Sequence, residues 1–169
     1  NKNMKKVLLG LLVLVSISAS AQVKRDKFID KYAGGNVKLT YQRSIDLDKG
    51  DTSYMVFFIF SNAKYTSITD TKVIGLYDKA SIEQWLKDMK NAYKQMNTGE
   101  KTNIDWTRDK YKLTLYDFSN NLYFAEAKGT GGYTMMSKKN VGELMELVST
   151  IDFGKETLLT AKTIDELIQ

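Results

Sequence analysis

The 169-residue chain contains no cysteine, no histidine and no proline. Without cysteine it has no disulfide, no thiol nucleophile and no thiolate metal site. Without histidine it cannot build a Ser-His-Asp or Cys-His mechanism, nor a histidine-based zinc site. Any catalysis would therefore rest on carboxylates, lysine, tyrosine or a serine–lysine pair.

Long apolar runs are also scarce, and the longest lies at the start of the chain. Lysines at positions 2, 5 and 6 precede an apolar segment at residues 7–15, and an Ala-x-Ala site ends at Ala21. This order is typical of a secretory signal peptide, so we expect residues 1–21 to be removed, with 1–3 lying upstream of the true start. An uncleaved anchor is the alternative, but the apolar segment is shorter than the roughly 20 residues that a spanning helix needs. We therefore predict a periplasmic or extracellular protein with no stable membrane insertion after cleavage.

The net charge is small once the leader is set aside. The total of +5 includes three leader lysines, so residues 22–169 carry 22 Lys and Arg against 20 Asp and Glu, a net charge of +2. This balance offers no electrostatic case for binding nucleic acid. A chain of this length buries roughly 68–70% of its unfolded surface, so we expect 22–169 to form a single globular domain.

Two hydrophobic periodicities in residues 22–169 predict an α+β fold. Alternating apolar residues predict strands at 37–47, 54–60, 64–69, 72–77, 103–107, 110–118, 121–127 and 132–136. Apolar residues three and four apart predict two long amphipathic helices, one beginning at Ser81 and one after Ser137. Segment 22–33, which ends before two glycines, and the capping box at Thr163 predict short N- and C-terminal helices. Because the strands are linked as hairpins, we expect one largely antiparallel sheet with both long helices packed on one face.

The densest apolar run of the predicted domain is residues 54–60. One side of this strand holds Tyr54, Val56, Phe58 and Phe60, and the other holds Met55, Phe57 and Ile59. Apolar residues on both sides favour a central strand that is covered on both faces. We expect the long helices to cover one face. The candidates to cover the second face are segment 22–33, the tail at 158–168 and another molecule. If neither segment does, the second face is the best candidate for a binding surface.

Tyrosines on the later strands form a first candidate site. Parity places Lys112, Tyr116 and Tyr123 on the same face, opposite the apolar one. Rigid amphipathic rings beside small residues can form a shallow surface for a peptide or a glycan. The alternative is an ordinary exposed sheet face.

Lysines near a glycine cluster form a second candidate site. Lys128 precedes the glycine-rich segment 129–132, and Lys138 and Lys139 lie in the first turn of the second long helix. The helix dipole disfavours cations there, and a broken local rule can mark function. We therefore consider an anion site made by these lysines and nearby N–H groups. Solvated lysines beside a hairpin loop are the alternative, because the glycines lack the spacing of a P-loop.

No pattern predicts a metal, a cofactor or a catalytic centre. Asp46, Asp48 and Asp51 surround a predicted turn, but the glycine position and the closing glutamate of an EF-hand are missing. The carboxylates near the later strands belong to no spaced motif; they are Asp105, Asp109, Asp117 and Glu126.

These observations predict a small exported, non-enzymatic binding or protein-interaction domain of the bacterial cell envelope or exterior. Its partner would be a protein, a peptide or a glycan. The alternative is a carrier that holds a small apolar ligand between sheet and helices, in a pocket lined by Trp85, Met89, Phe57 and Tyr93. An enzyme would need a cleft that brings two carboxylates together.

Overall fold

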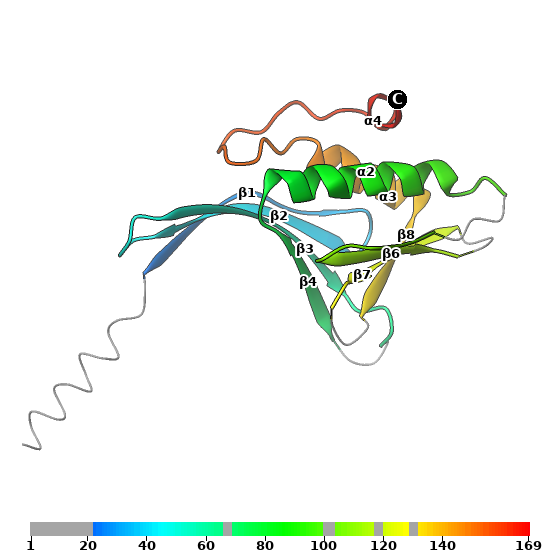
Figure 1. Cartoon of the computed structure of the whole chain (residues 1–169), viewed down its shortest axis with the longest axis horizontal. Helices are drawn as coiled ribbons and strands as arrows, with labels where there is room; N and C mark the ends of the chain where they lie inside the picture. The colour runs from blue at the N-terminus through cyan, green and yellow to red at the C-terminus, as the bar shows by residue number, and fades with distance from the viewer. Residues whose placement is uncertain (1–21, 66–68, 100–103, 117–119, 129–131) are drawn as a thin grey trace, which may run out of the picture.

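A computed structural model describes residues 22–65, 69–99, 104–116, 120–128 and 132–169 of the chain (Figure 1). Its described strands form two four-stranded antiparallel sheets, so the α+β class and the antiparallel pairing are confirmed. The expectation of one sheet is wrong, because a 17-residue helix separates the fourth strand from the fifth and these two strands do not pair. The predicted signal peptide lies outside the described residues.

The first sheet consists of four consecutive strands. They are β1 (Val23–Ala33), β2 (Val37–Asp46), β3 (Thr52–Ser61) and β4 (Thr71–Leu76). Each strand pairs with the next one along the chain, which leaves β1 and β4 as the edges. The predicted strands at 37–47, 54–60 and 72–77 are therefore confirmed. Residues 63 and 64 form a turn and 66–68 lie outside the described residues, so the strand predicted at 64–69 is wrong for its described part.

Segment 22–33 forms strand β1, and the N-terminal helix predicted there is wrong. A β-bulge shifts the register between Lys27 and Ile29, which lets two adjacent apolar residues face the core. Ile29 is buried, and the Phe28 ring lies 5.4 Å from the ring of Tyr41. The two glycines that resemble a helix cap instead form the β1–β2 turn, where Gly35 has a φ of 81°.

The second sheet is the predicted meander. Its strands are β5 (Ile104–Thr107), β6 (Tyr111–Leu115), β7 (Asn121–Glu126) and β8 (Tyr133–Ser137), paired in that order. The start of β8 is hydrogen-bonded to the end of the first sheet. Ala63 donates its N–H to the Tyr133 carbonyl at 2.7 Å, and the Asn62 side chain accepts the Tyr133 N–H at 3.2 Å.

The helices in the described part of the chain are α2 (Lys79–Gln95), α3 (Lys138–Val148) and α4 (Ile164–Ile168). α2 begins earlier than predicted, because the Asp78 carboxylate caps it by accepting the Ser81 N–H at 2.7 Å. Ser137 and Thr163 cap α3 and α4 as the sequence predicts. α2 and α3 lie side by side over the sheets, and α4 packs on α3 and α2 from outside (Figure 1).

An aromatic junction joins the two sheets and α2. Phe124 of β7 lies 5.5 Å from Phe58 and 5.7 Å from Phe60, measured between ring centroids. Trp85 of α2 stacks on Phe58 at 4.7 Å. The buried apolar residues of both sheets and all three helices consequently form one continuous core.

Candidate functional site

Within the described residues, other elements pack on only one face of the central strand β3. Val56 and Phe58 are buried in the core, whereas Phe57, which points to the opposite side of the sheet, is half-buried. β1 lies beside β2 within the same sheet, and the C-terminal segment packs on the helices (Figure 1). Neither segment that the sequence offers as a cover therefore lies over the second face of β3.

We call this second face of the first sheet the open face. Its apolar centre consists of Met55, Phe57, Ile59, Val73 and Tyr77. Val73 of the edge strand β4 and Tyr77, which follows that strand, are 45% and 52% exposed, although both are large apolar residues. A contiguous group of this kind on a folded domain is typical of an interaction surface.

The Tyr77 ring is folded back over the sheet. Gly75 allows this position, because any Cβ there would collide with the Tyr77 hydroxyl. The ring meets Phe57 edge-on, with 6.2 Å between centroids. Tyr77 thus broadens the apolar centre of the open face instead of projecting into solvent.

Charged side chains of β1 and β2 form the rim of the open face. Asp30 of β1 forms an ion pair with Lys38 at 3.0 Å and accepts the Thr40 hydroxyl at 2.9 Å. The hydrogen bonds from Lys38 and then Thr40 lower the pKa of Asp30 from 3.8 to about 2. An apolar centre with a charged rim is suited to burying the apolar surface of another molecule.

The predicted tyrosine site lies on the second sheet. Lys112, Tyr116 and Tyr123 occupy its outer face, and the rings of Tyr116 and Tyr123 are 5.2 Å apart. Tyr133 extends this row, 5.3 Å from Tyr123. Sequence analysis missed Tyr133, because the register of β8 against β7 depends on the connection between them. Lys112 is paired with Asp105 at 3.0 Å and flanks the row.

The three lysines of the predicted anion site are not brought together. Lys128 precedes β8 and pairs with Asp109 at 2.8 Å, whereas Lys138 and Lys139 follow β8. Five strand residues separate the two positions by about 17 Å. Lys139 pairs with Glu143 at 3.7 Å along α3. Glycines 129 and 131 lie outside the described residues.

Lys138 lies in the first turn of α3, where the helix dipole disfavours a cation, but its side chain binds the C-terminus of α2. Its ammonium group donates to the carbonyl of Met96, the C-cap of α2, at 2.9 Å. It also lies 4.8 Å from the ring centroid of Tyr93. Cations are favoured at a helix C-terminus, so a residue that is unfavourable for one helix stabilises its neighbour.

A buried carboxylate, Asp88, was missed by sequence analysis. Only 2% of it is exposed, and it lies on the apolar stripe of α2, three residues after Trp85. Arg108 binds it with two nitrogens at 2.6 and 2.8 Å, Tyr111 donates at 2.9 Å and Gln84 at 2.8 Å. A charged residue on an otherwise apolar stripe is the signal that could have identified this cluster.

The pKa of Asp88 is low in spite of its burial. Burial raises it, but the hydrogen bonds from Arg108, Tyr111 and Gln84 together bring it below its ordinary value. The Tyr111 pKa is raised by burial and by its bond to Asp88. Since the carboxylate stays ionised and is saturated with donors, it joins α2 to the second sheet and is poorly suited to act as a general base.

The residues named for a carrier pocket do not line one cavity. Trp85 and Met89 are fully buried in the core, Phe57 lies on the open face, and Tyr93 packs beside Lys138. No helix in the described part of the chain is long and apolar enough to cross a membrane.

In the acidic turn of the β2–β3 hairpin, one carboxylate is hydrogen-bonded to backbone N–H groups of the turn. The Asp46 carboxylate accepts the N–H groups of Asp48 and Lys49 at 3.0 and 3.1 Å. Within the ranges that the structure describes, no three acidic side chains are grouped to hold a metal ion. Comparison with protein-family models, with curated proteins and with solved structures finds no match to this chain.

Proposed function

We propose that this protein is a small exported, non-enzymatic binding domain that holds a protein partner on its open face. The observation that carries the proposal is the apolar centre on β3 and β4, which no described segment covers. The charge pattern supports it, because protein interfaces have an apolar centre that is poor in charge and a polar rim. The partner would lie in the periplasm or outside the cell, in line with the leader expected from the sequence.

The dimensions of the open face support a protein rather than a small ligand. Its two central strands have ten residues each. At about 3.3 Å per residue and about 4.8 Å between strands, a four-stranded face of this length covers roughly 600 Å². That approaches the roughly 800 Å² that each partner buries in a stable complex. The hollow that borders the face at Val73 and Tyr77 has a volume of about 260 Å³, below the roughly 300–1,000 Å³ typical of small-molecule pockets.

The experiment compares lysine substitutions at two positions whose native side chains are equally exposed. Val73 on the open face and Leu158 on the C-terminal segment are both 45% exposed. Immobilised wild-type protein, Val73→Lys and Leu158→Lys are each used to capture partners from an envelope extract. We expect Val73→Lys to lose the partner and Leu158→Lys to retain it, with unchanged circular dichroism in both. Retention by Val73→Lys would remove the open face from consideration.

The tyrosine row supports a second candidate function, the binding of a peptide or a glycan by the second sheet. The rings of Tyr116, Tyr123 and Tyr133 follow one another at about 5 Å on one face. Met135, also 45% exposed and also in an edge strand, lies beside them. Loss of the partner in Met135→Lys, with retention in Val73→Lys, would assign binding to this row instead.

A further inference from the structure

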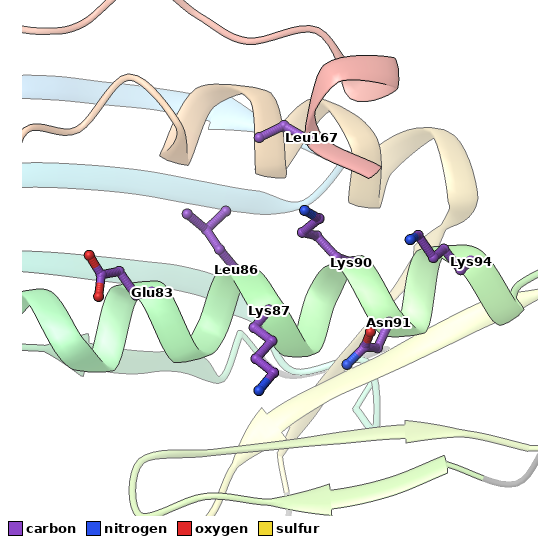
Figure 2. Close-up of a pocket in the computed structure, with 7 residues that line it drawn as sticks. All are labelled: Glu83, Leu86, Lys87, Lys90, Asn91, Lys94 and Leu167. Atoms are coloured by element: carbon purple, nitrogen blue, oxygen red, sulfur yellow. The ribbon is translucent and has the colours of Figure 1, made fainter. Parts of the chain in front are cut away.

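A hollow of about 410 Å³ runs along α2 and is bordered by Leu167 of α4, on the helix side of the molecule (Figure 2). Its apolar part is formed by Leu86 of α2 and Leu167 of α4. Three lysines of α2 surround this part: Lys87, Lys90 and Lys94. The hollow is on the opposite side of the first sheet from the open face, and the inference below does not rest on the proposed function.

The three lysines lie close enough along α2 to repel one another, although Lys94 is in the last turn, where the helix dipole favours a cation. They lie three and four residues apart on one helix, a spacing at which like charges destabilise a helix. Glu83, which is placed one turn from Lys87, pairs with Lys79 at 3.8 Å instead. Among the described residues, none of the three forms an ion pair within 4.0 Å, whereas Lys139 on α3 does. An anion bound in the hollow would relieve this repulsion.

The directions of the lysines identify the shape of the anion. Lys90 and Lys94 point toward α4, whereas Lys87 points to the other side of α2 (Figure 2). The ammonium groups therefore flank the hollow and do not converge on a point, as a compact phosphate would require. Seven residues of helix place Lys87 and Lys94 about 10 Å apart along the axis. An extended anion fits this arrangement, with carboxylates on both flanks and an apolar group at the leucines.

We infer that the hollow binds an acidic peptide segment of a protein, one that carries an apolar side chain between its carboxylates. The apolar side chain contacts Leu86 and Leu167, and the carboxylates pair with Lys87, Lys90 and Lys94. Such pairs lie at the surface, so they set specificity and the rate of association more than affinity. Binding is consequently weak and sensitive to salt.

The test measures binding of a fluorescent twelve-residue peptide of repeating Glu-Glu-Leu by anisotropy. The wild-type protein is compared with a triple variant, Lys87→Gln, Lys90→Gln and Lys94→Gln. We expect affinity to fall about tenfold in the variant, and a similar loss for the wild type when salt is raised from about 0.05 to about 0.5 M. A variant that binds like the wild type would overturn the inference.

A second triple variant controls for bulk charge. Lys31→Gln, Lys49→Gln and Lys64→Gln removes the same charge from exposed positions outside the hollow. Equal loss in both triple variants would show that only net charge matters, which overturns the inference. If millimolar inorganic phosphate displaced the peptide, the hollow would be a site for a compact anion, and the inference would be wrong. Tighter binding to phosphatidylglycerol vesicles than to the peptide, lost in the first variant, would assign a lipid surface.

Discussion

At residue scale, Asp88 shows how a charge is accommodated in a core. Removing it in Asp88→Ala leaves the Tyr111 hydroxyl and one side of Arg108 without their partner. Breaking a buried pair costs about 3–5 kcal/mol, and we expect about 2–3 kcal/mol because the Arg108 side chain is 40% exposed and regains water. Urea denaturation measures the loss. Glu83→Ala, an exposed change on the same helix, should alter stability by less than about 0.5 kcal/mol.

The lowered pKa of Asp30 predicts that the stability of the folded protein depends on pH. This pKa is about 2 in the folded protein and 3.8 as the ordinary value. A carboxyl with a lowered folded pKa stabilises the fold above its unfolded pKa, and this contribution is lost as pH falls through the folded value. The loss should therefore occur between about pH 4 and about pH 2. Carboxyl NMR should give a midpoint near 2 for Asp30, moving toward 3.8 in Lys38→Met; a wild-type midpoint near 3.8 would contradict this.

At the scale of elements, one tyrosine connects the C-terminal segment to β2. The Tyr41 hydroxyl accepts the Gly154 N–H at 3.1 Å and donates to the Lys155 carbonyl at 2.7 Å. Tyr41→Phe removes both bonds and keeps the buried ring. We expect a loss of about 1–2 kcal/mol and faster hydrogen exchange at Gly154. Tyr116→Phe, whose ring is exposed, should change neither quantity.

The same substitution at two turn glycines should lower the free energy of unfolding by different amounts. Gly34 and Gly50 both have a positive φ, of 67° and 74°. A Cβ at Gly50 meets nothing within 4 Å, whereas one at Gly34 would overlap the Asn140 carbonyl oxygen of α3. Gly50→Ala should therefore cost about 1 kcal/mol from backbone strain alone. Gly34→Ala should cost at least about 1 kcal/mol more, and equal losses on chemical denaturation would show that the contact with α3 is absent.

The elements that sequence analysis predicted correctly are those decided by local signals. Ser137 and Thr163 cap their helices through groups three residues away, so a short stretch of sequence contains the whole signal. The error at 22–33 has a different origin. Phe28 and Ile29 are adjacent, and the bulge in the pairing with β2 turns both toward the core, so the sequence does not show the strict alternation of a strand. Parity likewise predicted two apolar sides for β3, but not which side other elements would leave uncovered.

At the scale of the whole molecule, Phe124 predicts how the two sheets are coupled. Its ring contacts Phe58 and Phe60 of the other sheet and Trp85 of α2. Phe124→Ala should cost about 3–5 kcal/mol. Both sheets should still unfold together, so tryptophan fluorescence and circular dichroism should give one coincident transition. Separate transitions would show that each sheet is stable alone.

The division into two sheets could not be predicted, because strand periodicity indicates which residues share a face and not which strands pair. β4 and β5 look as suitable for pairing as β3 and β4 do. α2 lies between them, and its Trp85 must contact both Phe58 and Phe124. Phe58 and Phe124 also contact each other, so this cluster of three rings spans both sheets and could not be predicted from strand periodicity. The tyrosine row was predicted in part for the same reason, since Tyr116 and Tyr123 belong to adjacent hairpin strands and Tyr133 depends on the next register.

The strand order has a consequence for folding kinetics. In both sheets every strand pairs with its neighbour in sequence, so each strand pairing closes only a short loop. The chain also has no proline, so no prolyl isomerisation can delay refolding by tens of seconds. Refolding from urea should therefore finish without a slow phase. Such a chain reaches its native state without a prolyl isomerase or a disulfide-forming enzyme.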